Sequence, residues 1–370
     1  MSIEAAGRGV RAGFIGGGFM TEVHSRAVRA AGATPYGVAS SSAESAVAAA
    51  SRLGIARAYA SAGELIADPD VDVVHVCTPN TTHAGYAHAV IAAGKHVVCE
   101  KPLATSAADA DRLVTAVAQA GVVATVPFVY RFHPMVREAR ARVAAGELGS
   151  LLSIDGSYLQ DWLLLSDDDN WRVDATLGGP SRAFADIGSH LCDLVEFVTG
   201  DRIARLTATM RTFFPSRSTS KNITTEDAVA IVVETRSGAI GTLLVSQVAP
   251  GRKNRLAIEI AGTAESIGFD QEQPETLWLG RREGSQLIMR DGATLHPDAA
   301  RLSLLPAGHP LGYQDAFTAF VRDSYAAIAG EGPDGLPRFE DGARAARLTD
   351  AVLESATTGR RVELEENAND

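Results

Sequence analysis

The sequence predicts a two-domain α/β protein, with a parallel sheet in the first domain and an open antiparallel sheet in the second. Three observations support this fold class. The first third of the chain alternates short β-rich runs with Ala-rich stretches of helical spacing. After residue 150 the β-rich runs are longer and are joined by short turns. The chain has 370 residues, more than one ordinary domain holds, and we place the two domains at residues 1–128 and 129–370.

In the first domain, strand and helix patterns follow one another in regular alternation. Such an alternation requires right-handed crossovers between parallel strands. The predicted strands are Val10–Ile15, Pro35–Ala39, Val71–Val76, His96–Cys99 and Val122–Phe128, and the predicted helices are Ala43–Leu53, Ala84–Ala93 and Ser106–Gln119. Ligands of open parallel sheets bind at the carboxyl ends of the strands, so candidate residues are sought there.

The second domain is expected to form one open antiparallel sheet with helices over one of its faces. Gly146 and Gly149 mark the end of a helix at Pro134–Ala145, and Ser237-Gly238 is typical of a hairpin turn. The predicted strands are Leu151–Gln160, Ile203–Phe213, Ala228–Glu234, Ala239–Val248, Leu256–Ile260 and Thr276–Leu279, and the covering helices are Ser189–Thr199, Tyr313–Ala329 and Gly342–Thr357.

Charge and composition argue against several classes of partner. The formal net charge is −11, whereas phosphate backbones and anionic membranes attract basic surfaces. No run of about 18 apolar residues is present, and Met1–Val10 lacks the apolar core of a secretory signal. The three cysteines, Cys77, Cys99 and Cys192, lack metal-ligand spacing and are odd in number. We therefore expect a cytoplasmic protein with no nucleic-acid, membrane or metal partner.

A glycine-rich turn lies at the end of the first predicted strand. Gly16–Gly18 precede Phe19 and Met20, which open a helix. Glycines at this position let backbone N–H groups approach a pyrophosphate, which the helix N-terminus then stabilises. The third motif position holds Thr21 in place of Gly or Ala, and a plain tight turn would explain the glycines as well. The strand–turn–helix context favours a dinucleotide site.

The residues after the second strand bear on the type of nicotinamide cofactor. NAD sites usually place an acid here for the ribose 2′-hydroxyl, and NADP sites usually place an arginine nearby. This sequence has Ser40 and Ser41 instead, followed by Ser42. The pattern offers no cation for a 2′-phosphate, which favours NAD without excluding NADP.

Two further motifs carry acid–base side chains. Glu100 and Lys101 follow the strand His96–Cys99, which delivers the lysine to the carboxyl edge of the sheet. Asp186 and His190 are four residues apart at the start of a predicted helix, a spacing that can place both on one side. Each has a plain alternative: a surface lysine, a helix-capping aspartate and a satisfied polar histidine.

Taken together, these motifs and several others occur in the order seen in one known family. Essentially the whole chain resembles the glucose–fructose oxidoreductase/inositol dehydrogenase (Gfo/Idh/MocA) family, which implies an N-terminal Rossmann domain. The motifs that carry the resemblance are Gly16–Gly18, Thr78-Pro79-Asn80, Glu100-Lys101-Pro102, Tyr130-Arg131-Phe132, Trp171-Arg172, Asp186–His190 and Gly312-Tyr313-Gln314-Asp315. The combination is specific for the superfamily and not for a substrate.

The resemblance implies a role for each matching position. Lys101 matches the lysine that binds the reacting hydroxyl and shares in its proton transfer, and the Lys101-Pro102 peptide bond matches one that is often cis. Asp186 and His190 match the residues that complete the catalytic group. The residues expected near the cofactor are Gly16, Gly18, Phe19, Met20, Ser40, Ser41, Thr78, Asn80, His83, Glu100, Lys101, Trp171 and Arg172. Those expected near the substrate are Lys101, Tyr130, Trp162, Arg172, Asp186 and His190.

One basic stretch interrupts the acidic sequence. Five Lys and Arg residues lie within 202–225 with no acidic residue among them. They form either a solvated strand face and loop or a pocket for an anionic group of the substrate, with Arg217, Lys221 and Asn222 as its residues. Trp162 lies in a polar loop, where its ring suits a sugar, although core packing accounts for it nearly as well.

The sequence therefore predicts an NAD(P)-dependent oxidoreductase acting on a ring hydroxyl of a sugar, a sugar derivative or a cyclitol. Oxidation of a secondary carbinol leaves a hydroxyl proton, which a histidine and a lysine can relay while the lysine stabilises alkoxide charge. The same residues would serve an NAD-dependent glycoside hydrolase that oxidises, eliminates, hydrates and reduces, for example on a sulfoquinovoside. A non-catalytic dinucleotide-binding regulator is the third alternative. We expect a homodimer or homotetramer built through the open sheet.

Overall fold

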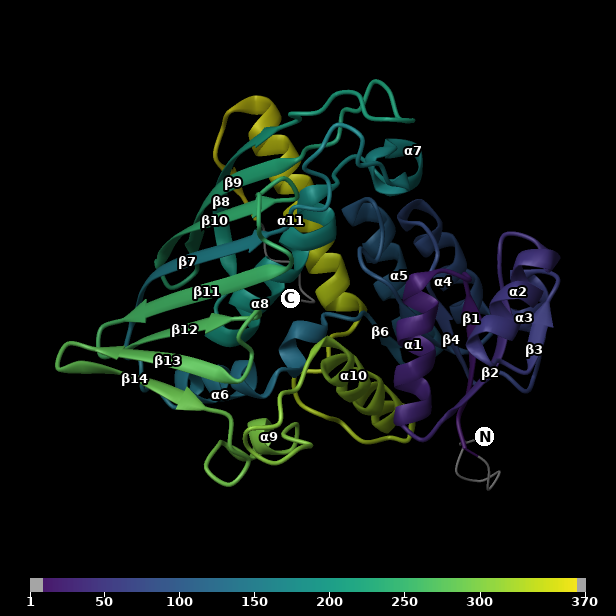
Figure 1. Ribbon diagram of the computed structural model, residues 1–370, viewed down its shortest axis with the longest axis horizontal. Coiled ribbons are helices and arrows are strands. Elements are labelled where there is room, and N and C mark those ends of the chain that lie inside the picture. Colours follow the sequence, from purple (N-terminus) through teal and green to yellow (C-terminus); the bar gives the residue numbers. More distant parts are fainter. Residues whose placement is uncertain (1–8, 365–370) are drawn as a thin grey trace. The chain divides into compact units, whose positions relative to one another are not determined.

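A computed structural model describes residues 9–364, so the residues 1–8 considered above and the segment 365–370 lie outside the described part. The chain divides into two compact units (Figure 1). The first comprises the chain up to Val129 together with Tyr313–Ala343, and the second comprises Tyr130–Gly312 with the chain from Arg344 onward. The assignment of residues 313–343 differs from the prediction, which places them in the second domain.

Sheet A of the first unit contains six parallel strands within residues 9–364, in the order β3-β2-β1-β4-β5-β6. From β1 the chain adds β2 and β3 on one side of the sheet and then β4, β5 and β6 on the other side. Open parallel sheets bind ligands at such a reversal of strand order, here between β1 and β4. The strands are β1 (Arg11–Ile15), β2 (Thr34–Ala39), β3 (Arg57–Tyr59), β4 (Val73–Val76), β5 (His96–Cys99) and β6 (Ala124–Thr125). The central strands are covered on both faces, and Phe14, Val74 and Val98 are at most 1% exposed.

Helices flank sheet A in the first unit. They are α1 (Phe19–Ala30), α2 (Ala43–Leu53), α3 (Ala62–Ala67), α4 (His83–Ala92), α5 (Ala107–Ala120) and α10 (Tyr313–Ile328). Serine side chains accept backbone N–H groups at the starts of α2, α3 and α5, at Ser42, Ser61 and Ser106. α10 packs against α1, and Gln314 Nε2 donates to the carbonyl oxygen of Val23 at 3.2 Å. This packing explains why residues 313–343 belong to the first unit.

Three elements of the first unit differ from the sequence-based prediction. β3 and α3 have no predicted counterpart, because they are short and largely exposed. β6 contains only two paired residues, whereas the pattern predicts a strand over Val122–Phe128. Pro127 lacks a backbone N–H and cannot extend the hydrogen-bond ladder. The other predicted strands and helices of this unit agree with the structure within two residues at each end.

Sheet B of the second unit is mostly antiparallel. Within the described chain its spatial order is β14 (Gly284–Met289), β13 (Thr276–Arg281), β12 (Ser266–Asp270), β11 (Arg255–Gly262), β7 (Leu151–Leu159), β10 (Ile240–Ser246), β9 (Ala228–Thr235), β8 (Ile203–Arg211) and β15 (Val362–Glu363). The prediction of an open antiparallel sheet is confirmed, with one parallel pair in it: β7 and β10 run parallel, with Ile240 opposite Ser153. β7 lies between β10 and β11, which run in opposite directions, so it must be parallel to one of them.

Helices cover one face of sheet B. α6 (Pro134–Ala144) and α8 (Ser189–Thr199) pack on the strands from β7 to β13, while the shorter α7 (Ala175–Gly178) and α9 (Pro297–Ala300) lie in the connections. α11 (Phe339–Thr358) begins in the first unit and ends in the second. Among residues 9–364, no helix combines the length and apolar character needed to cross a membrane.

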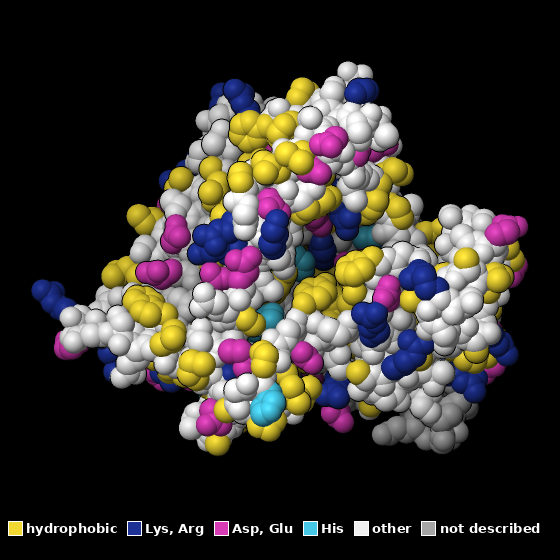
Figure 2. Space-filling view, viewed as in Figure 1, with side chains coloured by type: hydrophobic (Ala, Val, Ile, Leu, Met, Phe, Trp, Pro, Cys, Tyr) yellow, Lys and Arg dark blue, Asp and Glu magenta, His cyan; other side chains and the backbone are white. Residues whose placement is uncertain are grey.

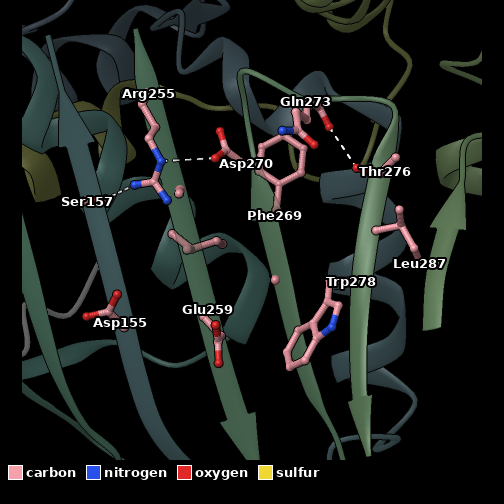
Figure 3. A pocket seen from close by; sticks show the side chains of 13 residues that line it. Asp155, Ser157, Arg255, Glu259, Phe269, Asp270, Gln273, Thr276, Trp278 and Leu287 are labelled. Atoms are coloured by element: carbon pink, nitrogen blue, oxygen red, sulfur yellow. Dashed lines mark hydrogen bonds and ion pairs between the residues drawn. The ribbon is translucent and has the colours of Figure 1, made fainter. Parts of the chain in front are cut away.

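The other face of sheet B holds a pocket (Figure 3). Asp155, Ser157 and Glu259 line it from strand positions that alternate with buried ones, so they point away from α8. Arg255 reaches across this face, donating to Ser157 Oγ at 2.7 Å and pairing with Asp270 at 3.2 Å. The pocket is therefore on the opposite side of the sheet from the helix that carries His190.

Candidate active site

The turn between β1 and α1 leaves little room for any residue but glycine. Gly16 has a φ of +113°, and a Cβ there would lie 2.5 Å from the carbonyl oxygen of Cys77. A Cβ on Gly17 would lie 3.0 Å from Ser40 Oγ. Gly18 is the N-cap of α1, and no side chain caps the first turn of this helix. N–H groups at such a helix start are donors suited to a phosphate.

Thr21 accounts for the departure from the glycine motif. Its hydroxyl donates to the carbonyl oxygen of Gly16 at 2.8 Å, and the side chain is buried. The threonine therefore holds the same turn through a contact that glycine or alanine would lack. Phe19 is 70% exposed and Met20 is half-buried, so the uncapped turn is reached from solvent.

The end of β2 is neutral, but a cation reaches the glycine turn from elsewhere. Ser40 and Ser41 follow β2. Arg52, in the last turn of α2, donates to the carbonyl oxygen of Gly17 at 2.5 Å and pairs with Glu22 at 3.3 Å. Sequence reasoning missed Arg52, because no spacing rule brings the end of α2 to this turn.

His83 holds together the loops that follow β4 and β5. Its Nε2 lies 2.7 Å from the carbonyl oxygen of Thr78, and its Nδ1 lies 2.7 Å from that of Pro102. Burial lowers the pKa of His83, although these two carbonyl oxygens act in the opposite direction. Asn80 is also buried, at the start of a single turn of 3₁₀ helix. His83 thus contributes by positioning the segment of Thr78 and the segment of Lys101.

Lys101 lies just after the carboxyl end of β5, and its peptide bond to Pro102 is cis. The buried carboxylate of Glu100 accepts hydrogen bonds from the backbone N–H of Lys101 and from His24 Nε2, both at 3.0 Å. Burial raises the pKa of Glu100, but the bond from His24 and the charge of Lys101 outweigh it, so the pKa lies below its ordinary value. Glu100 is therefore ionised, and its carboxylate holds the backbone at Lys101.

Asp186 lies on a π-helical turn, Phe184–Gly188, that runs directly into α8. Such turns are frequent at functional sites. Gln247 Nε2 donates to Asp186 Oδ2 at 2.8 Å, and Arg172 Nε lies 3.5 Å from Asp186 Oδ1. The carboxylate is therefore oriented through both of its oxygens. Sequence reasoning missed Gln247, a wholly buried residue at the end of β10.

His190, on α8, borders a closed ring of hydrogen bonds. Its imidazole is edge-on to Tyr130, with the ring centroids 5.1 Å apart. Tyr158 donates to Asn254 Oδ1 at 2.8 Å, Asn254 Nδ2 donates to the Tyr130 hydroxyl at 3.1 Å, and the two tyrosine oxygens are 2.5 Å apart. Because each hydroxyl donates once, Tyr130 must donate to Tyr158. Burial raises the pKa of Tyr130, which keeps the phenol neutral.

Trp162 is oriented by the same ring. Gln160 Nε2 donates to Asn254 Oδ1 at 2.7 Å, and Trp162 Nε1 donates to Gln160 Oε1 at 2.7 Å. The half-buried indole is thereby linked through Asn254 to Tyr130. Sequence reasoning missed Tyr158 and Asn254, since the first fits the ordinary alternation of a strand and the second lies in a turn.

Trp171 and Arg172 lie in one loop of the second unit, where the guanidinium stacks 4.5 Å above the indole ring. The loop is fastened through Asp169, whose carboxylate accepts backbone and hydroxyl hydrogen bonds from Thr219 and Ser220 at 2.7–2.9 Å. Burial alone would raise the pKa of Asp169, but these bonds lower it well below its ordinary value.

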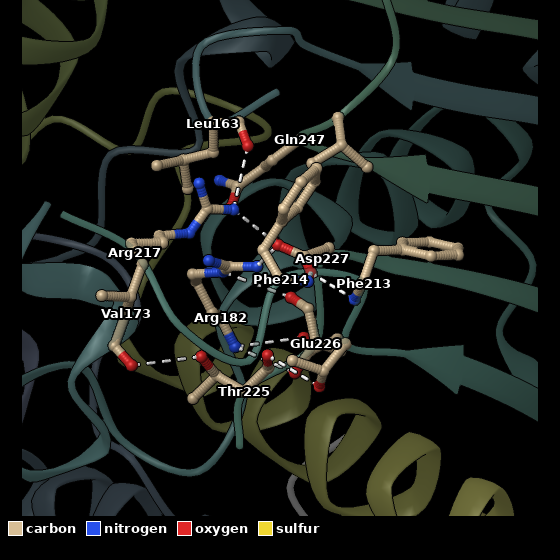
Figure 4. A network of polar contacts seen from close by, with 12 residues as sticks. Leu163, Val173, Arg182, Phe213, Phe214, Arg217, Thr225, Glu226, Asp227 and Gln247 are labelled. Carbon is tan, nitrogen blue, oxygen red and sulfur yellow. Dashed lines mark hydrogen bonds and ion pairs between the residues drawn. The ribbon is translucent and has the colours of Figure 1, made fainter. Parts of the chain in front are cut away.

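Arg217 is a buried structural residue, which corrects its assignment to a substrate pocket (Figure 4). Its guanidinium donates to Asp227 at 2.9 Å and to three carbonyl oxygens at 2.9–3.0 Å, those of Leu163, Leu165 and Asp168. Asp227 balances the positive charge of Arg217. The guanidinium N–H groups bind carbonyl oxygens of the loop that carries Trp162. Arg217 therefore anchors that loop instead of facing a ligand.

Other members of the basic stretch are also paired within the protein. Lys221 Nζ donates to the carbonyl oxygen of Arg217 at 2.7 Å, and Asn222 adopts a left-handed turn with a φ of +53°. Arg202 pairs with Glu196, six positions away, and Arg205 pairs with Glu234 and Glu363, which are distant in the sequence. Figure 2 shows lysine and arginine side chains beside aspartate and glutamate side chains on the visible face. The stretch is therefore not an isolated patch of positive charge.

The candidate catalytic residues are divided between the two units. Lys101 and the glycine turn belong to the first, whereas Asp186, His190 and Tyr130 belong to the second. Lys101 offers an ammonium group, and Asp186 and His190 offer a carboxylate and an imidazole. Within residues 9–364, no group of three or more His, Cys, Asp or Glu is arranged to hold a metal ion.

Comparisons with known proteins agree with this division. Residues 10–128 match the model of an oxidoreductase family with an NAD-binding Rossmann fold, and residues 136–268 match the Gfo/Idh/MocA C-terminal domain. The chain is 33% identical to levoglucosan dehydrogenase of Pseudarthrobacter phenanthrenivorans, over 93% of this chain and 95% of that one.

Solved structures extend the likeness to the whole fold. An oxidoreductase domain protein from Kribbella flavida has a TM-score of 0.90 and 34% identity, over 97% of this chain and 100% of that one. A levoglucosan dehydrogenase in complex with NADH and levoglucosan has a TM-score of 0.91 and 31% identity, with the same coverage. The chain belongs to the Gfo/Idh/MocA family and is an NAD-dependent oxidoreductase of that type.

Proposed function

We propose that this enzyme oxidises a ring hydroxyl of a sugar, a sugar derivative or a cyclitol, with Lys101, Asp186 and His190 managing the proton. The observation that carries the proposal is the carboxyl edge of sheet A, where the uncapped glycine turn after β1 and Lys101 after β5 belong to one unit. The levoglucosan dehydrogenase with NADH and levoglucosan bound supports the substrate class, because it covers nearly the whole chain.

The residues present fit NAD. The N–H groups at the start of α1 would hold the pyrophosphate, since no side chain caps that turn. Ser40 and Ser41 would offer hydroxyl groups to the adenosine ribose. Arg52 is tied to Gly17 and Glu22, so it is not placed as a free cation for a 2′-phosphate, which favours NAD over NADP. When bound, the nicotinamide supplies the acceptor of the hydride.

The side chains then have separate tasks. The ammonium group of Lys101 would bind the reacting hydroxyl and stabilise the negative charge that develops on its oxygen. His190 would accept the hydroxyl proton. Asp186, oriented by Gln247, would fix the geometry of this group. Tyr130 and Trp162, held by the ring of hydrogen bonds through Asn254, would contact the sugar.

A redox-neutral glycoside hydrolase would use the same three residues, and an anionic glycoside would need a basic pocket. Arg217, the strongest candidate for that pocket, is engaged with Asp227 and with backbone oxygens. We therefore propose a net dehydrogenase acting on a neutral carbohydrate.

The test is incubation with NAD and a panel of neutral sugars, anhydrosugars and inositols, followed by absorbance at the NADH wavelength. We expect stoichiometric NADH with at least one panel member, and loss of turnover in Lys101→Met with NAD affinity retained. Release of an aglycone from a glycoside without net NADH would instead establish the hydrolase. Binding of NAD without turnover of any panel member would favour the regulator.

We also propose a homodimer or homotetramer built through the outer face of sheet B. Large apolar side chains are 45–62% exposed there on the neighbouring strands β9 and β10, at Val232, Ile240 and Leu244. Contiguous exposed apolar surface of this kind marks association. A cytoplasmic location is proposed as well, because Cys77, Cys99 and Cys192 are free thiols.

A further inference from the structure

Four buried polar side chains from four different elements form a chain of hydrogen bonds in the first unit. His24 comes from α1, His75 from β4, Glu100 from the end of β5 and Tyr325 from α10. His24 and His75 are 0% exposed, Glu100 is 5% and Tyr325 is 7%. None of the tasks assigned above to Lys101, Asp186 and His190 uses the two histidines or the tyrosine.

The distances define a continuous sequence of partners. Tyr325 Oη lies 2.8 Å from His75 Nε2, His75 Nδ1 lies 2.8 Å from His24 Nδ1, and His24 Nε2 lies 3.0 Å from Glu100 Oε1. Glu100 Oε2 then accepts the backbone N–H of Lys101 at 3.0 Å. The chain therefore ends at the residue that we propose binds the reacting hydroxyl.

The chemistry of the groups gives this chain a direction. An ionised carboxylate only accepts, so His24 must carry a proton on Nε2. A neutral His24 then accepts at Nδ1, His75 must donate from Nδ1 and accept at Nε2, and Tyr325 donates its hydroxyl proton. Each ring carries one proton, and every nitrogen has a partner. In this chain both imidazole rings are neutral, and the carboxylate of Glu100 accepts from His24 Nε2 and from the backbone N–H of Lys101.

We propose that Tyr325, His75 and His24 form a directed hydrogen-bond chain that holds Glu100 as a two-point acceptor and thereby fixes the backbone at Lys101. His24, His75 and Tyr325 are positioning residues, since they act through Glu100. The tautomer of each ring follows from the hydrogen-bond distances together with an ionised Glu100 and two neutral rings, whereas the effect on turnover rests on the proposed function of Lys101.

Glu100 sets the donor-to-acceptor direction of the hydrogen-bond chain, and a single substitution at this position should reverse that direction. In Glu100→Gln the backbone N–H of Lys101 still requires an oxygen, so the amide NH₂ group must face His24. His24 Nε2 then becomes an acceptor, His24 donates from Nδ1, and His75 donates from Nε2 to the oxygen of Tyr325. Tyrosine tolerates both directions because its hydroxyl both donates and accepts.

The first measurement is ¹⁵N NMR of the histidine side chains in the full-length protein at about pH 8, with signals assigned through single histidine substitutions. We expect His24 to carry its proton on Nε2 and His75 to carry its proton on Nδ1. In Glu100→Gln we expect the proton of each ring on the other nitrogen, Nδ1 of His24 and Nε2 of His75. Tautomers that stay the same in Glu100→Gln, or a His24 protonated on both nitrogens in the unsubstituted protein, would overturn the directed chain.

The second measurement is kinetic and separates positioning from mere stability. His75→Leu leaves His24 Nδ1 without its donor, and we expect kcat to fall about tenfold with KM for the sugar changed less than about twofold. The matched control is Ser324→Ala, which removes a buried 3.1 Å hydrogen bond between α10 and Thr125 next to the chain. It should lower the melting temperature while leaving kcat unchanged.

Equal losses of kcat in His75→Leu and Ser324→Ala would remove the positioning role. If both ring protons change nitrogen in Glu100→Gln but the unsubstituted enzyme oxidises no carbinol, the directed chain is upheld and the proposed function is rejected. The two conclusions therefore fail separately.

Discussion

Gln247 and Asp186 are joined by a hydrogen bond of 2.8 Å from the amide nitrogen to one carboxylate oxygen. Gln247 is wholly buried, and its backbone N–H donates to the carbonyl oxygen of Asp227 at 3.0 Å, so the amide is fixed at the end of β10. An amide oxygen turned toward Asp186 would be repelled by the carboxylate, which settles the orientation of the side chain. Gln247 thus holds the carboxylate of Asp186, a member of the proposed catalytic group, in place.

Gln247→Leu removes this donor, and Gln247→Glu replaces it with a second carboxylate. A hydrogen bond to a charged acceptor contributes about 1.5–3 kcal/mol, so Gln247→Leu should lower kcat/KM by about ten- to a hundredfold. In Gln247→Glu the like charge disfavours ionised Asp186, so the acid limb of the pH–rate profile should move to higher pH. An unmoved acid limb in a normally folded Gln247→Glu variant would contradict the role.

Arg217→Met should destabilise the protein strongly. Asp227 would keep Arg182 as its partner but lose the second cation, and three backbone oxygens would lose their donor. Breaking a buried ion pair from one side costs about 3–5 kcal/mol, so the free energy of unfolding in urea should fall by about that amount. Arg211→Met, at an exposed strand end, is the control and should change it little. Normal stability with a raised KM for anionic sugars would restore the substrate-pocket interpretation.

Asp169 should make the loop of Trp171 sensitive to acid. Its pKa is lowered in the folded protein by the hydrogen bonds of Thr219 and Ser220, so the carboxylate binds a proton less readily folded than unfolded. Its stabilising contribution is therefore present above the unfolded pKa of about 3.9 and is lost as the pH falls through the folded value. In Asp169→Asn, the difference in melting temperature between pH 5 and about pH 2.5 should shrink, because this range runs from above the unfolded pKa toward the folded pKa. The same difference in both proteins would refute the assignment.

Ser41 offers a test of cofactor choice. Ser41→Asp places a carboxylate after β2, where an acid pairs with the ribose 2′-hydroxyl and repels a 2′-phosphate. We expect the ratio of Kd for NADP to Kd for NAD to rise at least about tenfold, as measured by cofactor fluorescence. Glu44→Gln, which alters charge in the first turn of α2, serves as the comparison. A falling ratio in Ser41→Asp would place the ribose elsewhere.

Leu244→Glu should weaken the proposed oligomer. Leu244 is 45% exposed on the outer face of sheet B, and a buried carboxylate there would lack a partner. Light scattering after gel filtration should give a smaller mass for Leu244→Glu than for the unsubstituted protein. Val47→Glu alters an equally apolar exposed site on α2 and should leave the mass unchanged. A monomer before substitution would reject the interface altogether.

Local chemistry made much of the fold predictable. Ser42 and Ser106 cap helices whose predicted starts agree with the structure within one residue, and the strand His96–Cys99 has the predicted bounds. Gly16 has the positive φ that a tight strand–helix turn demands. Such features depend on a few consecutive residues, so a sequence pattern contains them.

The supporting contacts of the candidate site could not be predicted, because they join distant parts of the chain. Gln247 and Asp186 are 61 positions apart, and Arg217 and Leu163 are 54 apart. A single sequence shows that Arg217 is positively charged, but it does not show that Asp227 and three carbonyl oxygens surround it. The positive charge of Arg217 therefore led to the prediction of a ligand pocket, whereas in the structure Arg217 anchors the loop that carries Trp162.

The bond between Tyr325 and His75 spans 250 positions of the chain, although both residues belong to the first unit. At a synthesis rate of about 5–20 residues per second, His75 is added to the growing chain roughly 12–50 seconds before Tyr325 is. The nucleotide-binding half of the enzyme is thus completed only after nearly all of the other half has been made. A nascent chain that stalls before α10 carries the dinucleotide motif while the surface of α1 that α10 covers is still exposed to solvent.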